Sequence, residues 1–162
     1  MQLKQFTDYG LRVMLFVGRA SDRTCTMSEV AAHHNISLEH LRKVVHRLAQ
    51  LGYLRSTRGR GGGIALGRDP ATIRIGEVVV AMEGDVNVID CEALACVLSP
   101  GCSLKSALDR ASRAFISTLD DITLADLLND RKMRRQFRDL ELSRDGAIPI
   151  SQPARDRSRK VE

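Results

Sequence analysis

Two short helical segments, joined by a turn and followed at once by a glycine-tipped hairpin, constrain this 162-residue chain more than any other feature. The stretch from Thr26 to Glu29 has the form of a capping box, and Asn35 suits the left-handed residue that ends a helix. Ser37 can cap a second helix, whose apolar residues recur at helical spacing until Gly52. Two helices joined in this way form a helix-turn-helix pattern.

The segment after Gly52 predicts a β-hairpin. Residues 53–58 and 63–66 have the alternation or the apolar run of strands, and three of the four residues between them are glycines. A basic hairpin directly after a helix-turn-helix is a wing, whose arginines can contact phosphates or a narrow minor groove. We therefore predict a winged helix-turn-helix DNA-binding domain over residues 1–82.

The charges are distributed as such a domain requires. Between Ser37 and Arg68 there are seven basic residues and one acidic residue, whereas residues 77–130 hold ten acidic and three basic residues. Residues 131–162 hold ten basic and five acidic residues, so this tail accounts for the net charge of +5. A neutral body with one basic stretch localises a phosphate-binding face.

The side of the second helix that is opposite its apolar stripe carries residue types that contact phosphates and base edges. We predict that this side and the wing form the DNA-contacting set. Its members are Ser37, Leu38, Glu39, His40, Arg42, Lys43, His46, Arg58, Arg60, Gly61 and Gly62. A merely solvated charged face is the alternative interpretation, and the adjoining basic wing argues against it.

The other segments predict a mainly α protein, since six aromatic residues and no Trp suit packed helices better than a large sheet. Thr7 and Asp8 predict the capped start of a first helix, and residues 75–82 predict a short one. An apolar stripe from Leu104 to Ile122 predicts a long amphipathic helix, with one more turn at 124–128. We expect the region 104–130 to mediate dimerisation and residues 131–162 to form a basic, disordered tail.

Three cysteines lie within twelve residues, at Cys91, Cys96 and Cys102. Their spacing differs from that of zinc knuckles, an odd number does not divide into disulfides, and thiolates on a loop are the usual ligands of iron-sulfur clusters. We therefore predict a cluster-binding loop over residues 83–103. Zinc and incidental buried cysteines are the alternatives. The isolated Cys25 is interpreted as a small apolar filler.

A cluster usually has four ligands, so the fourth must come from elsewhere. Asp8, Glu92, one of the four histidines and a group of the partner subunit all remain open from the residues alone. The histidines lack a ligand-like spacing, and His33 and His34 are expected at a solvated helix end.

The sequence excludes several classes of protein. No apolar run approaches the roughly 20 residues that span a bilayer, and the first ten residues are too polar for a secretion signal, so we expect a cytoplasmic protein without a membrane partner. No catalytic arrangement is evident, so we expect no enzyme. A cluster-containing electron-transfer protein, and a regulator that binds a partner enzyme without a cluster, are the competing functions.

Four motifs together resemble the NsrR/IscR family of winged-helix regulators, over roughly residues 1–130. These are the string Phe6–Arg12, the helix from Lys43 that continues into Leu51–Leu54, the wing Arg58–Ile64 and the three cysteines. The cysteine spacing and the run Ile73–Val79 are most similar to the nitric-oxide-sensing, NsrR-type members. IscR-like members carry a histidine ligand three residues after the last cysteine, where this chain has Lys105.

The resemblance implies a nitric-oxide-responsive repressor that binds palindromic operator DNA as a homodimer and releases it when the cluster is damaged. It implies one cluster per subunit, [4Fe-4S] or [2Fe-2S], with Asp8 of the other subunit as the fourth ligand. Asp8 also has a structural interpretation, because an acidic residue suits a first helical turn and Arg12 follows four residues later. A regulator of cluster biogenesis or stress genes is the alternative within the family.

Overall fold

A computed structural model describes residues 2–20, 23–57, 59, 62–84, 86–89, 91, 96–98 and 101–135. Residues Met1–Asp130 form one compact unit and Arg131–Glu162 a second. The disorder expected of the tail concerns residues that lie almost wholly outside the described ones. In chain order the elements are α1 (Gln5–Arg19), α2 (Met27–His34), α3 (Leu38–Gln50), β1 (Leu54–Thr57), β2 (Gly63–Leu66), the 3-10 turn η1 (Pro70–Thr72), α4 (Ile75–Glu83), α5 (Ser103–Asp120) and α6 (Leu124–Asn129).

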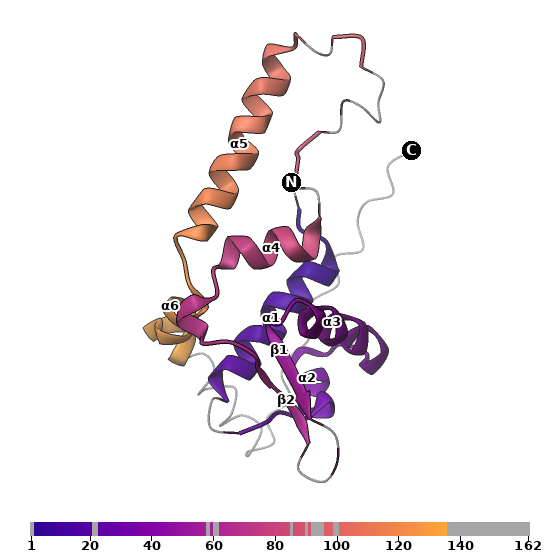
Figure 1. Cartoon of the computed structure of the whole chain (residues 1–162), viewed down its shortest axis with the longest axis vertical. Coiled ribbons are helices and arrows are strands. Elements are labelled where there is room, and N and C mark those ends of the chain that lie inside the picture. The colour runs from indigo at the N-terminus through magenta and orange to yellow at the C-terminus, as the bar shows by residue number, and fades with distance from the viewer. Residues whose placement is uncertain are drawn as a thin grey trace, which may run out of the picture. The chain divides into compact units, whose positions relative to one another are not determined.

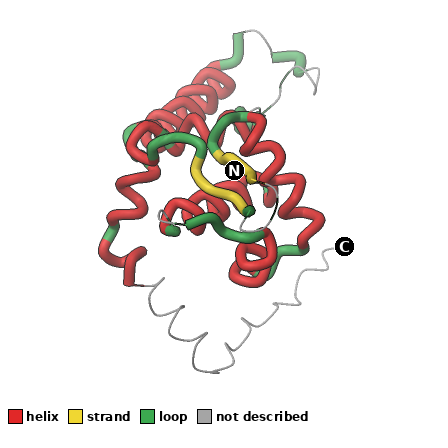
Figure 2. The backbone as a smooth tube through the Cα atoms, turned by 60° about the horizontal axis from the view of Figure 1, so that its bottom comes forward, coloured by secondary structure: helices red, strands yellow, loops and turns green. Residues whose placement is uncertain are grey.

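The mainly α fold and the winged helix are confirmed (Figures 1 and 2). The capping box of α2 is formed, because Thr26 N donates to Glu29 Oε2 at 2.6 Å and Glu29 N donates to Thr26 Oγ1 at 3.2 Å. Asn35 ends α2 in the left-handed conformation, with φ of 52°. Ser37 Oγ then accepts from His40 N at 3.3 Å, as expected of the N-cap of α3.

The wing is an antiparallel pair in which Leu54 faces Leu66 and Thr57 faces Gly63. Its second strand also pairs with the segment before α2, since Cys25 N donates to Ile64 O at 2.9 Å and Ile64 N to Cys25 O at 2.8 Å. Cys25 is fully buried, which confirms its assignment as an apolar filler.

The core of residues 1–130 lies where α1, α3 and α4 meet, and α4 packs against both α1 and α5. Fully buried side chains come from all three helices and from the chain between and after them: Val13, Met14, Leu41, Val44, Leu48, Ile73, Val78, Val79 and Leu124. Glycines allow the closest approaches. A Cβ at Gly10 would lie 2.8 Å from Cε of Met82, so α1 and α4 are in contact there.

Two predicted helix boundaries are wrong. The first helix begins at Gln5, with Lys4 as its N-cap, so Thr7 lies inside the helix and is fully buried instead of capping it. The long helix ends at Asp120, before Ile122, and residues from Leu124 form a separate helix. Thr123 and Asp126 form a capping box that starts this α6, and the pairing of Arg74 with Thr123 fixes the chain between the two helices.

The long helix α5 extends away from α2 and α3 (Figure 1). All of α5 is described, and Ser112 is its one buried residue, although the helix is amphipathic. Leu104 is 63% exposed at its first turn. Within the described residues, no helix is both long enough and apolar enough to cross a membrane.

Candidate nucleic-acid interface and cysteine cluster

The predicted DNA-contacting residues of α3 lie on one exposed side of the helix. Apolar residues at helical spacing turn the opposite side into the core, so the polar residues between them face solvent. The exposed members are Ser37, Leu38, Glu39, His40, Arg42, Lys43 and His46. Glu39 and Lys43 form an ion pair of 3.0 Å whose side chains are mostly exposed, a contact that a nearby phosphate can replace at little cost.

The wing lies beside α3, with both strands described and its tip described in part. Gly62 N donates to Gly59 O at 2.9 Å, which closes the hairpin. At its base, the guanidinium of Arg68 lies 4.3 Å from the ring centre of Tyr53. Three predicted contact residues of the tip, Arg58, Arg60 and Gly61, lie outside the described residues.

All four cysteines lie in the described part of the chain and are free thiols. Cys91 is buried, Cys96 and Cys102 are partly exposed, and Cys96 N donates to Cys91 O at 3.1 Å. Desolvation raises the pKa of Cys91, and the neighbouring Cys96 and Cys102 thiols raise it further, whereas Lys105 lowers it. Cys91 therefore lies close enough to both other thiols to interact with them electrostatically.

The donor chemistry fits an iron-sulfur cluster, because three free thiols in one segment of the chain are its usual ligands. Among the described residues, however, no group of three or more His, Cys, Asp or Glu side chains is arranged to hold a metal ion. Residues 92–95 and 99–100, which connect the three thiols, lie outside the described ones, and so does the candidate ligand Glu92.

Lys105 and Asp109 belong to the surroundings of Cys91, and the sequence analysis did not predict their ion pair. They form a half-buried ion pair on α5, with Nζ 2.7 Å from Oδ2. Their spacing of four residues, directly after the last cysteine, is the signal that indicates such a pair.

Asp8 takes the structural role that its position in a first helical turn allows. Its Oδ1 accepts from Arg12 Nε at 2.9 Å, one turn further along α1. A surface hollow of about 650 Å³ surrounds the pair and is lined by Gln2, Leu3, Gln5, Asp8, Leu11 and Arg12. The fourth-ligand role of Asp8 remains a prediction that requires a second subunit.

His33 and His34 lie at the end of α2, as expected, but they are partly buried and not simply solvated. Both rings pack against Phe16 of α1, with ring centres 4.7 Å and 5.8 Å away. Burial lowers the pKa of His34 to about 4, and Nε2 of His34 has no hydrogen-bond partner among the described residues. These rings therefore connect α1 to the helix-turn-helix.

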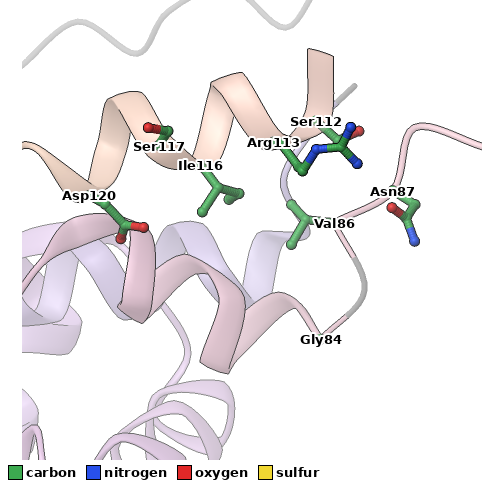
Figure 3. A pocket seen from close by; sticks show the side chains of 8 residues that line it. All are labelled: Gly84, Val86, Asn87, Ser112, Arg113, Ile116, Ser117 and Asp120. Carbon is green, nitrogen blue, oxygen red and sulfur yellow. The ribbon is translucent and has the colours of Figure 1, made fainter. Parts of the chain in front are cut away.

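A second hollow, of about 420 Å³, lies between the end of α4 and the middle of α5 (Figure 3). Ile116 and Val86 contribute apolar surface to it, and Ser112, Arg113, Ser117 and Asp120 contribute polar groups. It lies along the side of α5 that packs against α4.

Comparison with known proteins places these features in a family. Residues 3–130 match the family model Rrf2, described as an iron-dependent transcriptional regulator. The chain is 45% identical over 138 residues to the HTH-type transcriptional regulator NsrR of Bacillus subtilis, which covers 82% of this chain and 93% of that protein. It is also 45% identical over 141 residues to NsrR of Geobacillus kaustophilus, covering 85% and 96% respectively.

Solved structures show the same fold. The global cysteine regulator CymR of B. subtilis superimposes with a TM-score of 0.68 at 27% identity, over 79% of this chain and 96% of that one. IscR of T. potens gives a TM-score of 0.66 at 24% identity, over 80% and 88%.

Proposed function

This chain belongs to the Rrf2 family of transcriptional regulators, and from that premise we propose that it is a nitric-oxide-responsive repressor. In this proposal a homodimer that carries one iron-sulfur cluster per subunit binds palindromic operator DNA. Reaction of nitric oxide with the cluster then releases the DNA. Relatives that share the NsrR name and are 45% identical support a repressor over an enzyme.

The single observation that carries the proposal is the presence of two features in one compact unit. The exposed, basic side of α3 suits DNA, and three free thiols follow one another in the segment that leads into α5. An electron-transfer protein has no use for the first feature, and a regulator without a cofactor has no use for the second.

The DNA-binding step follows from the geometry of a dimer. Two copies of α3 in successive major grooves require half-sites about 34 Å apart. Arg42 and Lys43, with Arg58 and Arg60 of the wing, supply phosphate contacts, so the affinity falls steeply with salt concentration. The remaining residues of the exposed side of α3 select the bases.

The homodimer is supported by the surface that a single chain leaves exposed. An 18-residue amphipathic helix with one buried residue is stable when a partner covers its apolar side. Val97 and Leu98, near the thiols, are 93% and 66% exposed. A second copy that packs along α5 covers these residues and fills the hollow between α4 and α5.

Cys91, Cys96 and Cys102 would hold the cluster, whose iron supplies the reactivity toward nitric oxide. Asp8 from the partner subunit would complete the ligand set, after exchanging its ion pair with Arg12 for the iron. An aspartate ligand from the DNA-binding domain of the other subunit gives each cluster a direct mechanical connection to that domain. The chain's own part is to bring three thiolates and one carboxylate together at the dimer interface.

Anaerobic purification followed by DNA binding tests the proposal. We expect a brown protein that contains iron and sulfide, shifts operator-containing DNA and loses the shift after nitric oxide is added. Protein stripped with a chelator is the control. A colourless protein that shifts DNA equally well contradicts the proposal, and a response to oxygen or iron supply in place of nitric oxide supports the alternative regulator of cluster biogenesis or stress genes.

A further inference from the structure

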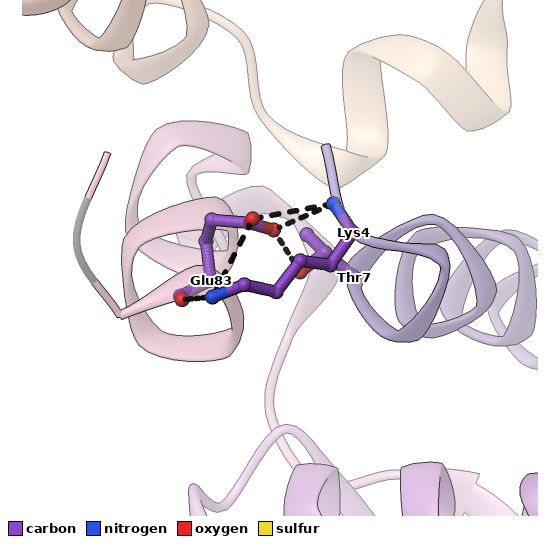
Figure 4. Close-up of polar contacts among 3 residues, drawn as sticks. All are labelled: Lys4, Thr7 and Glu83. Atoms are coloured by element: carbon purple, nitrogen blue, oxygen red, sulfur yellow. Dashed lines mark hydrogen bonds and ion pairs between the residues drawn. The ribbon is translucent and has the colours of Figure 1, made fainter. Parts of the chain in front are cut away.

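The last turn of α4 is tied to the first turn of α1 by a buried carboxylate (Figure 4). Both oxygens of Glu83 accept from the backbone N–H of Lys4, at 3.1 and 3.2 Å, and one also accepts from the hydroxyl of Thr7. In return, Nζ of Lys4 donates to the backbone carbonyl of Glu83 at 2.8 Å. Four hydrogen bonds therefore connect two helix ends that are far apart in the sequence.

This contact is built as a permanent part of the fold. The Glu83 side chain is 8% exposed and Thr7 is fully buried, so a carboxylate without these donors would be strongly unfavourable. The contact also suits both helix dipoles, because a negative group lies at the N-terminus of α1 and a positive group at the C-terminus of α4. The carboxylate of Glu83 thus stabilises the N-terminus of α1, and the ammonium group of Lys4 stabilises the C-terminus of α4.

Helix α3 contacts the same turn of α4. Arg47, in the last turn of α3, donates from Nη2 to the backbone carbonyl of Ala81 at 3.1 Å. Arg47 lies one turn after Lys43, but its guanidinium is directed to α4 and not to the DNA-contacting side. The orientation of α3 relative to α4 is therefore fixed by a polar contact in addition to the core.

The segment that carries the three thiols, residues 84–102 and here called the cysteine segment, begins where these contacts end. Gly84 has a φ of 81°, which a glycine adopts without strain, and its N–H still donates to Val80 O at 3.0 Å. Cys91, the first thiol, follows seven residues later and is buried. At its N-terminal end, the cysteine segment is therefore continuous with the turn from Ala81 to Glu83.

We propose that this last turn of α4 couples the cysteine segment to the DNA-contacting side of α3. Glu83 and Arg47 act as positioning residues. Glu83 transmits a displacement to α1, and Arg47 transmits it to α3. The inference rests on the proposed function, since it assigns the route by which the state of the thiols changes the affinity for DNA. It adds two residues that contact neither the cluster nor the DNA.

The first test measures the ratio of operator affinities of the cluster-loaded and the chelator-stripped protein. Arg47→Met removes the contact with Ala81, and Thr7→Val removes one donor to Glu83. Arg47→Lys and Thr7→Ser are the conservative variants, because each keeps a hydrogen-bond donor. Arg23→Met is the matched control, because it breaks an arginine–carboxylate pair with Glu29 on α2. We expect Arg47→Met, Thr7→Val and Glu83→Gln each to lower the ratio by roughly tenfold, at unchanged iron content.

The outcomes separate the two proposals. A wild-type ratio of one overturns the proposed function. A large wild-type ratio that Arg47→Met and Thr7→Val leave unchanged overturns the coupling alone. A variant that weakens DNA binding equally in both forms has a general structural role or contacts phosphate, which also contradicts the coupling.

Amide hydrogen exchange in the stripped proteins tests the mechanical connection without the cluster. We expect Glu83→Gln to accelerate exchange severalfold in α3 as well as at the start of α1, whereas Arg23→Met leaves α3 unchanged. Acceleration confined to the first turn of α1 and the last turn of α4 contradicts the inference.

Discussion

The helix-turn-helix with its wing differs from the cysteine segment in how completely a single chain caps its helix ends and buries its apolar side chains. Within the first region, α2 and α3 have side-chain N-caps, and Leu41, Val44 and Leu48 are buried. In the described part of residues 84–102, one cysteine is buried while Val97 and Leu98 face solvent. The first region is complete in a single chain, whereas the second leaves apolar side chains and free thiols uncovered, as the proposed cluster and second copy would require.

This difference predicts that the two regions fail in different ways. Changes in the first region lower the stability of folding, and changes in the second lower DNA binding without lowering stability. The predictions below test this separation, beginning with the largest effect.

Cys96→Ala removes a predicted cluster ligand from the incomplete region. We expect operator affinity of the anaerobically purified protein to fall by about 10²- to 10³-fold, which corresponds to about 3–4 kcal/mol. The melting temperature of the stripped protein should stay within a few degrees of the wild type. Cys25→Ala is the control. Because Cys25 is buried beside the wing, this variant should retain full iron content. Equal operator affinity of Cys96→Ala and wild type would show that the cluster does not control DNA binding.

Leu48→Ala tests the opposite side of the comparison. Leu48 is fully buried, so the cavity should lower the free energy of unfolding by about 3 kcal/mol, measured by urea denaturation of the stripped protein. The protein that remains folded should bind iron as the wild type does. Loss of iron from the folded fraction would mean that the two regions are not independent.

Asp8→Ala tests whether the comparison breaks down at one residue, since Asp8 lies on α1, outside the cysteine segment, but is the predicted fourth ligand of its cluster. We expect an altered cluster absorption spectrum and roughly tenfold weaker operator binding by the loaded protein. Arg12→Met removes the same exposed ion pair, which contributes less than about 1 kcal/mol, and should leave the spectrum unchanged. Identical behaviour of the two variants assigns Asp8 to the ion pair alone.

The pH dependence of stability should reveal His34. Its pKa is lowered from 6.5 to about 4 in the folded protein, first by burial. Below pH 6.5 His34 is protonated in the unfolded chain, whereas in the folded protein it stays neutral until about pH 4. The free energy of unfolding therefore decreases as the pH falls from 6.5 to 4. Partial exposure reduces the effect to roughly 1 kcal/mol. Urea titrations of wild type and His34→Gln between pH 7 and pH 4.5 measure it, and parallel curves contradict the assignment.

Local signals were enough to predict the winged helix from the sequence. The capping box at Thr26, the left-handed Asn35 and the N-cap at Ser37 act over a few residues, and all three are present in the structure. The exposed side of α3 followed from helical periodicity alone. DNA contact by its residues, and cluster binding by the three cysteines, remain predictions.

The errors arose where a distant partner decides the conformation. Thr7 looks like an N-cap in the sequence, but its hydroxyl is used by Glu83, 76 residues away. His34 is polar and lies near a helix end, yet Phe16 of another helix covers it. The end of α5 at Asp120 is set by the next capping box, at Thr123, and by the strand-like pairing of Arg74. Periodicity carries no information on such long-range pairs.

The backbone pairing of Cys25 with Ile64 has a consequence for the operator. It joins the start of the helix-turn-helix to the second strand of the wing. The distance between α3 and the wing is therefore held constant by backbone hydrogen bonds. In the proposed complex the major-groove and wing contacts are therefore gained and lost together. A single base pair inserted between them should abolish both sets of contacts, whereas a flexible wing would follow the displaced groove.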